Sequence, residues 1–446
     1  MDGRSSSRVL VVGLGLSGVA AARLAAADGA EVVVTDRRSE PELAEVLAQL
    51  PSGVHTFFGG HPEPCLDGVD VVVVSPGVPP TVELLVAARE RGLDLVTEVE
   101  FAWRHRPDAP LVAITGSNGK STVTTLVAEM LRVAGFDAVA GGNLGTAASE
   151  LVLAGGWDRW VLEISSFQSE LLTTMAPSVA VFLNLSQDHL ERHADLGDYL
   201  AAKRQLFAYQ RGDDTAVLNA DDPASAGTET VAVRRFFSLD HQADAWLNGD
   251  RLLIDGEDVL SADGVRLSGA HNLSNILAAA LASIAVGASL DAVAQAAASF
   301  DGLAHRHRTV HEIAGVRWID DSKATNIGAT LAALRGYPAG SLHLILGGQA
   351  KGQDFKVLAD EVQRAVARLY VIGIDGPVIA QSLAGSAPVE SCGTLVEAVS
   401  RARTAAEAGQ AVLLAPACAS FDQFTGYEQR GDVFAALARE EVAACL

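Results

Sequence analysis

One stretch of the sequence combines glycines, a lysine and two hydroxyl side chains at a spacing that suits phosphate binding. The apolar run Leu111–Thr115 predicts a buried strand, and a helical pattern begins at Lys120. The tight turn between them reads Gly116-Ser-Asn-Gly-Lys-Ser-Thr122. Such a turn directs backbone N–H groups and a helix N-terminus at one point, which favours a phosphate chain. Lys120 can reach the outer phosphates, and Ser121 or Thr122 can place a hydroxyl on the accompanying Mg²⁺.

The match to the standard phosphate-loop pattern is incomplete. That pattern has a glycine six residues before the lysine, where this sequence has Ile114. The ending Gly-Lys-Ser-Thr between a strand and a helix is nevertheless specific. The alternative, a glycine turn with a solvated lysine, leaves the hydrophobic strand and the paired hydroxyls unexplained. We therefore predict ATP binding.

Polar residues also follow two other predicted strands. Strand Trp160–Ile164 carries Glu163 near its carboxyl end, and strand Val179–Leu185 precedes a loop that contains Asp188 and His189. Ligands of open parallel sheets bind beyond the carboxyl ends of the strands, so these side chains are expected to face the phosphates. Carboxylate, hydroxyl and phosphate oxygens form an ordinary Mg²⁺ shell. His189 is then either a less usual ligand or a loop residue, and Asp188 is either a ligand or a cap.

The beginning of the sequence carries a second glycine motif. Gly13-Leu-Gly-Leu-Ser-Gly18 follows the predicted strand Val9–Val12, and the predicted strand Glu31–Thr35 ends at Asp36. Taken alone, this pattern predicts NAD binding. The phosphate loop at Gly116 makes an ATP-driven enzyme the better interpretation, so we expect a nucleotide-sugar at the first motif. Dinucleotide binding and purely structural glycines are the alternatives.

The remaining sequence alternates strands and helices, which predicts an α/β fold with three domains in series. Linkers are expected near Thr97–Pro110 and Phe300–Arg308, and Arg234–Gly269 predicts a small β insertion. The C-terminal strands predict another parallel sheet. The expected domains are 1–98, Rossmann-like; 99–303, a phosphate-loop ATPase-like parallel sheet; and 304–446, Rossmann-like.

Composition limits the class of protein. A chain of 446 residues suggests three domains at roughly 150 residues each. Hydrophobic residues make up 49% of the chain and charged residues 20%, so large cores are expected. The formal net charge of −22 argues against nucleic acid or an anionic membrane as a partner. Local Lys, Arg and Mg²⁺ must therefore offset this field where anionic ligands bind.

Cysteine usage and the N-terminal pattern indicate a compartment. The four cysteines are scattered without a Cys-x-x-Cys pair, which favours reduced thiols. Arg23 interrupts the apolar run Val9–Ala27, so this run does not predict a signal peptide. We expect a cytoplasmic protein with no transmembrane segment and no membrane insertion.

Taken together, these segments resemble the Mur ligases of peptidoglycan synthesis. The resemblance runs nearly end to end in matching order. Its segments are Gly13–Gly18, Thr115–Thr122, Glu163–Gln168, Asn184–His193, Lys203, His271–Asn275, His305-Arg306, Asp321–Asn326 and Ala417–Phe424. The first and the last three of these resemble the member that adds D-glutamate.

The resemblance implies an ATP-dependent ligase that joins D-glutamate to UDP-N-acetylmuramoyl-L-alanine, and we expect a monomer. The L-alanine carboxylate would attack the γ-phosphate of ATP to give an acyl phosphate. The amine of D-glutamate would then form the amide through a tetrahedral intermediate. Lys120, Glu163, His189 and Lys203 would be the catalytic residues.

The resemblance also implies three sets of binding residues. The UDP-substrate would bind Leu16, Ser17, Asp36, Arg37, Asn143, Ser165 and Gln168. ATP would bind Gly116, Ser117, Asn118, Gly119, Lys120, Ser121, Thr122, Asn275, Arg306 and Asp321. D-glutamate would bind Lys323, Thr325, Lys351, Ser420 and Tyr427.

Two Mg²⁺ ions are implied at Ser121, Glu163, His189 and Lys203. From its residue type alone, Lys203 in a predicted helix is a solvated or phosphate-pairing lysine. It matches the lysine that the family carries as a carbamate, a CO₂ adduct. This modification has a chemical reason, because an ammonium group cannot ligate Mg²⁺ whereas a carbamate donates oxygens.

Departures from the family pattern leave alternatives open. Gln349 stands where an acidic residue is expected, and Tyr427 stands where phenylalanine is expected. An Asp-Asn-Pro-Arg segment is absent, which argues against the diaminopimelate- or lysine-adding member. Another Mur ligase or a folylpolyglutamate synthetase shares the phosphate loop. Outside the class, the rivals are an NAD-dependent oxidoreductase and a nonenzymatic nucleotide-binding regulator.

Overall fold

A computed structural model describes residues 7–105, 108, 110–188, 192–267, 269–350 and 352–440. The predicted site residues His189 and Lys351 lie outside these ranges. The chain divides into two compact units, of which one contains the N-terminal and central sheets and the other the C-terminal sheet. The segment 266–272 groups with the second unit.

The N-terminal sheet has five parallel strands in the order β3-β2-β1-β4-β5. Its central strands are almost entirely valine, leucine and threonine and are buried, as expected for a parallel sheet covered on both faces. Strands β3 and β5 lie outside the predicted strands. The elements are β1 (Arg8–Val12), α1 (Leu16–Ala27), β2 (Glu31–Asp36), α2 (Ala44–Leu47), β3 (His55–Phe58), β4 (Val71–Val74), α3 (Glu83–Glu90) and β5 (Asp94–Thr97).

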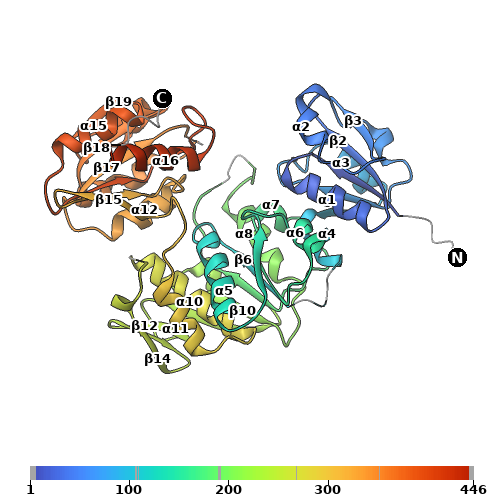
Figure 1. Cartoon of the computed structure of the whole chain (residues 1–446), viewed down its shortest axis with the longest axis horizontal. Helices are drawn as coiled ribbons and strands as arrows, with labels where there is room; N and C mark the ends of the chain where they lie inside the picture. Colours follow the sequence, from blue (N-terminus) through green and yellow to red (C-terminus); the bar gives the residue numbers. More distant parts are fainter. Residues whose placement is uncertain are drawn as a thin grey trace. The chain divides into compact units, whose positions relative to one another are not determined.

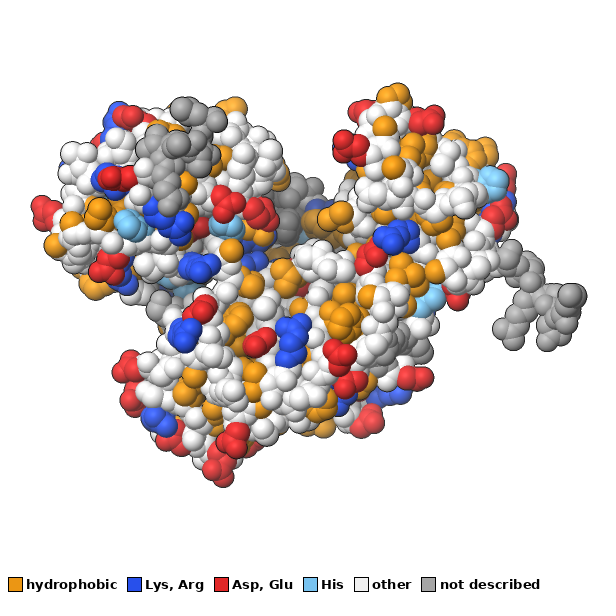
Figure 2. Space-filling view, viewed as in Figure 1, with side chains coloured by type: hydrophobic (Ala, Val, Ile, Leu, Met, Phe, Trp, Pro, Cys, Tyr) orange, Lys and Arg blue, Asp and Glu red, His pale blue; other side chains and the backbone are white. Residues whose placement is uncertain are grey.

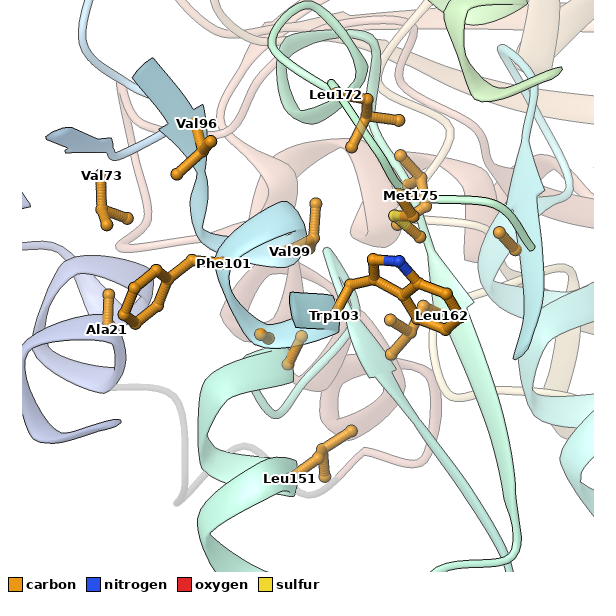
Figure 3. Close-up of a cluster of buried hydrophobic side chains, with 14 of the residues drawn as sticks. Ala21, Val73, Val96, Val99, Phe101, Trp103, Leu151, Leu162, Leu172 and Met175 are labelled. Carbon is orange, nitrogen blue, oxygen red and sulfur yellow. The ribbon is translucent and has the colours of Figure 1, made fainter. Parts of the chain in front are cut away.

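The predicted linker at Thr97–Pro110 is wrong over most of its length. Helix α4 (Glu98–His105) occupies it, and Phe101, Ala102 and Trp103 of this helix are buried. Figure 3 shows the Phe101 ring extending from α4 toward Ala21, and Trp103 of the same helix beside Leu162. One hydrophobic cluster therefore joins side chains of the N-terminal and central sheets through this helix. The basic residues at the end of α4 masked this role in the sequence.

The central sheet has nine strands in the order β14-β13-β12-β11-β10-β9-β6-β8-β7. Figure 1 shows β6 beside α5 near the middle of this part of the chain. The elements are β6 (Leu111–Thr115), α5 (Lys120–Val133), β7 (Ala138–Gly142), α6 (Ala148–Ala154), β8 (Arg159–Glu163), α7 (Ser166–Ser169), β9 (Val179–Phe182), α8 (Leu196–Arg204), β10 (Thr215–Asn219), α9 (Pro223–Ala226), β11 (Val233–Ser238), β12 (Ala245–Asn248), β13 (Arg251–Ile254), β14 (Glu257–Ser261), α10 (Ala270–Ala285) and α11 (Leu290–Ser299).

The structure refines two predictions for the central region. The short strands expected between Arg234 and Gly269 are present, but they extend the central sheet: β11 pairs with β10, and β12, β13 and β14 continue from it. Strand β9 ends at Phe182 rather than at Leu185. Beyond this point the backbone bonds to side chains: Leu183 O accepts from Asn219, and Leu185 N donates to Asp222.

The C-terminal sheet has six strands in the order β15-β16-β20-β17-β18-β19. The prediction of a parallel sheet is correct for five of them, whereas the edge strand β15 is antiparallel to β16. A tight connection through Ala314 and Gly315, both with positive φ, makes this hairpin possible. The elements are β15 (Arg308–Ile313), β16 (Val316–Asp320), α12 (Ile327–Arg335), β17 (Leu342–Gly347), α13 (Ala359–Ala365), β18 (Val366–Ile372), α14 (Gly376–Ser382), β19 (Val389–Gly393), α15 (Leu395–Ala405), β20 (Ala411–Leu414) and α16 (Tyr427–Ala438).

The surface carries the acidic excess of the sequence. Figure 2 shows acidic side chains spread over the visible face of each part of the chain, with Lys and Arg interspersed among them. Among the described residues, no helix is both long and apolar enough to span a membrane.

Candidate active site

The turn between β6 and α5 has the geometry of a phosphate loop. Strand β6 is completely buried, and Gly119 is the N-cap of α5 with a φ of +87°. A Cβ added to Gly119 would lie 2.5 Å from Asn275 Oδ1 on α10, and one added to Gly116 would lie 3.0 Å from Leu183 Cβ. The positive φ at both positions favours glycine, and these neighbouring side chains would crowd an added Cβ. The N-cap Gly119 has no side chain with which to cap α5, and the first N–H groups of the helix suit an anion.

Lys120 folds back over this loop. Its Nζ donates to Gly116 O at 2.8 Å and to Ser117 O at 2.9 Å. These contacts hold the ammonium group beside the turn, where it can neutralise a bound phosphate.

Glu163 lies at the carboxyl end of β8, next to the start of α5. The side chain is 3% exposed, and its carboxylate accepts hydrogen bonds from Ser121 Oγ and from Asn143 Nδ2, the latter at 2.7 Å. The backbone N–H of Asn143 also donates to Glu163 O at 2.9 Å. The structure thus brings Ser121 and Glu163 together as predicted, and it places Asn143 beside them. Hydroxyl and carboxylate oxygens at one point fit the donor set of Mg²⁺.

Lys203 lies on α8 and is 1% exposed, so the alternative of a solvated lysine is wrong. Its Nζ donates to Gly116 O at 2.7 Å and lies 4.3 Å from the centroid of the Tyr199 ring. A hydroxyl contact of 3.3 Å links Tyr199 to Ser117. Lys203 therefore reaches the phosphate loop from a separate helix.

Asn184 forms hydrogen bonds with the backbone of the phosphate loop, although the predicted site does not include it. Its Oδ1 accepts from Asn118 N at 2.9 Å, and its Nδ2 donates to Asn118 O at 3.1 Å. Its carbonyl also accepts from Ser117 N at 2.9 Å. A polar residue directly after a buried strand is the sequence signal for such a contact, but its partner depends on the tertiary fold.

Gly13 and Gly18 form the tight turn that the N-terminal motif predicts. A Cβ on Gly18 would lie 1.9 Å from Gly13 O, so only glycine fits. The Asp36 carboxylate accepts from Leu14 N at 2.7 Å and from Arg38 Nη2 at 2.8 Å. Burial opposes ionisation of Asp36, yet these hydrogen bonds outweigh it and lower its pKa to about 2. Asp36 is thus engaged by its own domain, and its contact with the UDP-substrate stays a prediction.

The other predicted UDP-substrate residues divide into exposed and buried groups. Leu16 is 83% exposed, Ser17 is partly exposed and Arg37 is exposed, so all three are accessible to a ligand. Ser165 and Gln168 instead form a capping box at the start of α7, with Ser165 N donating to Gln168 Oε1 at 2.9 Å. A structural role explains this pair, and substrate binding by it stays a prediction.

Of the predicted C-terminal site residues, Asp321, Lys323 and Thr325 follow β16, Ser420 follows β20, and Tyr427 is the first residue of α16. Asp321 accepts from His307 N at 3.2 Å, and Lys323 Nζ lies 3.9 Å from the centroid of the Tyr427 ring. Thr325 N donates to Lys323 O at 2.7 Å. Ser420 is buried, whereas Arg306 is partly exposed. Gln349 is exposed, and its backbone forms hydrogen bonds with the backbone of Ala419. Asn275 belongs to the unit that holds the phosphate loop, whereas Arg306 and Asp321 belong to the other unit.

Asp188 accepts a hydrogen bond of 2.9 Å from Asn326 Nδ2. Within the described ranges, no group of three or more His, Cys, Asp and Glu side chains could hold a metal. The oxygen donors at Ser121 and Glu163 therefore need further ligands for a complete Mg²⁺ shell, and His189 lies outside the described residues.

The chain combines a strand, turn and helix with the geometry of a phosphate loop and two further α/β sheets, and this combination indicates the class of the protein. Three family models match the chain: "Mur ligase MurD-like, N-terminal domain" at residues 7–97, "Mur ligase middle domain" at 114–283 and "Mur ligase, glutamate ligase domain" at 305–418. The chain therefore belongs to the Mur ligase family.

Curated relatives are similar over nearly their whole length. The UDP-N-acetylmuramoylalanine–D-glutamate ligase of Anaeromyxobacter dehalogenans is 43% identical, with 98% of each chain covered. The enzyme of the same name from Acidobacterium capsulatum is 41% identical, covering 96% of this chain and 95% of the relative.

Solved structures share the fold. UDP-N-acetylmuramate-alanine ligase MurC from Thermotoga maritima aligns with a TM-score of 0.61 at 18% identity, over 98% of this chain and 100% of the other. A pseudomurein peptide ligase type C from Methanothermus fervidus also gives a TM-score of 0.61 at 18% identity, over 92% and 96%.

Proposed function

We propose that this chain is an ATP-dependent ligase that joins D-glutamate to UDP-N-acetylmuramoyl-L-alanine in peptidoglycan precursor synthesis. Relatives that carry this activity in their names are about 40% identical over nearly the full chain. The observation that carries the ATP-dependent step is the contact of Ser121 with the buried Glu163 carboxylate beside the phosphate loop.

The proposed reaction has two steps. The L-alanine carboxylate attacks the γ-phosphate of ATP, which forms an acyl phosphate and releases ADP. The amine of D-glutamate then attacks the acyl carbon, and the tetrahedral intermediate expels phosphate to leave an amide. Two anions meet in the first step, so the Lys120 ammonium and the N–H groups of the loop stabilise the charge that develops. No protein nucleophile is needed.

Ser121 and Glu163, with His189 and a carbamate on Lys203, are the residues that would hold two Mg²⁺ ions. When bound, these ions neutralise phosphate charge and polarise the reacting oxygens. The buried position of Lys203 at 2.7 Å from Gly116 O supports this assignment, because a CO₂ adduct there would place oxygens near the phosphate loop.

The remaining assignments complete the proposal. The N-terminal domain, 1–98, holds the UDP group; the central domain, 99–303, holds ATP; and the C-terminal domain, 304–446, receives D-glutamate. Lys351 pairs with a carboxylate of the amino acid, with Lys323, Thr325, Ser420 and Tyr427 around it. We propose a cytoplasmic monomer, in keeping with the nucleotide substrates.

The test is Mg²⁺- and ATP-dependent phosphate release with UDP-N-acetylmuramoyl-L-alanine and a panel of amino acids. We expect release with D-glutamate and none with L-glutamate, together with a product heavier by one glutamyl residue. Release with another amino acid would keep the ligase class and refute the D-glutamate site. A change in nicotinamide absorbance without phosphate release would instead support an oxidoreductase.

A further inference from the structure

The turn that follows β10 binds the neighbouring strand through side chains. Strand β10 lies between β9 and β11, and Asn219 is its last residue. Asn219 Nδ2 donates to Leu183 O at 2.9 Å, and Asp222 Oδ2 accepts from Leu185 N at 3.0 Å. Both contacts hold the backbone just beyond the end of β9. We call residues 219–225 the β10 turn.

Ser225 closes this arrangement. It is completely buried, and its Oγ donates to Phe182 O at 2.5 Å while accepting from Asn219 N at 2.9 Å. Ser225 N donates to Asp222 Oδ1 at 2.9 Å, so Asp222 also caps the short helix α9. Each carboxylate oxygen of Asp222 thus accepts from a different backbone N–H: Oδ1 from Ser225 in the same turn, and Oδ2 from Leu185 beyond β9.

The segment that the β10 turn holds is the one that positions the phosphate loop. Asn184 lies between Leu183 and Leu185, and it bonds both the N–H and the carbonyl of Asn118 through its side chain. Its carbonyl accepts from Ser117 N as well. The orientation of the loop backbone therefore depends on the end of β9, which in turn depends on the β10 turn.

We propose that Asp222 is a positioning residue for the nucleotide, acting through Asn184 on the backbone of the phosphate loop. Asp222 has no role in chemistry itself. Because N–H groups bind phosphate only when they converge on one point, a small displacement of the loop weakens the site. This inference rests on the proposed function insofar as it assigns ATP to the loop.

The neighbouring Asp221 provides a matched control. Its Oδ2 accepts from Leu239 N at 2.7 Å, and its Oδ1 accepts from Ser238 Oγ at 2.5 Å. Asp221 therefore holds the backbone beyond β11, as Asp222 holds the backbone beyond β9. β11 lies on the side of β10 away from β6 and the phosphate loop.

The experiment compares Asp222→Asn with Asp221→Asn in the full chain. Asparagine offers one acceptor oxygen, so one of the two N–H groups at position 222 loses its partner, although asparagine is itself a good N-cap. We expect the Kd for ATP, measured by calorimetric titration with Mg²⁺, to rise about tenfold for Asp222→Asn. Asp221→Asn should change this Kd less than about twofold. Because the titration measures ATP binding without turnover, its result is informative even if D-glutamate is not the substrate.

A double-mutant cycle tests the route through Asn184. If Asp222 acts through it, Asp222→Asn should weaken ATP binding much less in an Asn184→Ala background. An undiminished effect in that background would overturn the proposal. Equal effects of Asp221→Asn and Asp222→Asn on the Kd, or no effect of Asp222→Asn, would also overturn it. If Asp222→Asn does not fold, Asp222→Ser takes its place with the same tenfold expectation, because serine keeps an N-cap oxygen for Ser225 N but has no second oxygen for Leu185 N.

Discussion

Lys120 shows how one residue meets the electrostatic demand of this site. The protein carries a net charge of −22, yet its proposed ligands are anions. The ammonium group of Lys120 is held at the loop by Gly116 O and Ser117 O, at 2.8 and 2.9 Å. A cation fixed at the loop attracts a bound phosphate at short distance. This attraction is stronger than the repulsion from the more distant, screened acidic side chains.

We expect Lys120→Ala to lower kcat by at least about a hundredfold, because the γ-phosphate loses its cation during phosphoryl transfer. The measurement is ATP-dependent phosphate release under saturating substrates. Arg132→Ala, in the last turn of the same helix, removes an exposed cation and should keep the rate. A Lys120→Ala rate within a few-fold of the unmodified enzyme would contradict the assignment.

Lys203 permits a chemical test of the proposed carbamate. We expect Lys203→Ala to lose most activity and to regain part of it on addition of short carboxylic acids, whose oxygens replace those of the carbamate. Phosphate release with and without acetate or formate measures this rescue. Lys203→Arg should be inactive, because a guanidinium cannot ligate a metal; full activity of this variant would refute the carbamate.

At the scale of elements, a buried acid links helix α4 to helix α6. Glu98, its first residue, is fully buried, and Oε1 accepts from Ser149 N in α6 at 2.5 Å. The opposite oxygen, Oε2, has no hydrogen-bond partner among the described residues. Burial outweighs the hydrogen bonds from Ser149 and raises the pKa of Glu98 to about 7.

This pKa predicts a pH-dependent stability. Because the folded pKa lies above the ordinary value of 4.5, protonated Glu98 favours folding. That contribution is complete below pH 4.5 and is lost as the pH rises through about 7. Glu98→Gln stays neutral and keeps an acceptor for Ser149 N.

We therefore expect Glu98→Gln to gain stability relative to the unmodified protein by up to about 3 kcal/mol between pH 4.5 and pH 8. Urea unfolding at both pH values measures the difference in the free energy of unfolding. A difference between the two proteins that does not vary with pH would show that Glu98 does not titrate in this range.

At the scale of the whole molecule, the three sheets do not correspond to three independent cores. A single hydrophobic cluster includes Val11 of β1, Phe101 of α4 and Leu162 of β8, so the N-terminal and central sheets share it. The C-terminal sheet has its own clusters on its two faces. We infer that the first two sheets unfold together, because unfolding either one would expose the apolar side chains of the shared cluster to water, which is unfavourable.

Phe101→Ala tests this shared core. We expect it to lower the free energy of unfolding of the unit that contains both sheets by about 3–5 kcal/mol, because the ring is only 6% exposed. Phe421→Ala removes the same atoms at a position that is 70% exposed and should have little effect. Calorimetry and circular dichroism follow the transitions. Loss of the N-terminal sheet alone, with the central sheet still folded, would contradict a shared core.

Local sequence was sufficient for much of this protein. The phosphate loop, its glycines and the strand and helix around it follow from short-range patterns, because a strand, a tight turn and an amphipathic helix each leave a signature within a few residues. The same is true of the turn at Gly13–Gly18 and of β16, β17 and β20. Glu163 could be placed near the loop, because carboxyl ends of parallel strands share one edge.

Tertiary structure decided the contacts that no local pattern encodes. Helix α4 resembled a linker, and its burial became evident only when two sheets packed against it. The partners of Asn184, Asp222 and Lys203 are 66, 37 and 87 residues away in the chain. The same type of side chain can be solvated, can cap a helix or can position a neighbouring segment. Its role depends on which groups the fold places beside it. That choice depends on burial and hydrogen-bond geometry, which exist only after the sheets assemble.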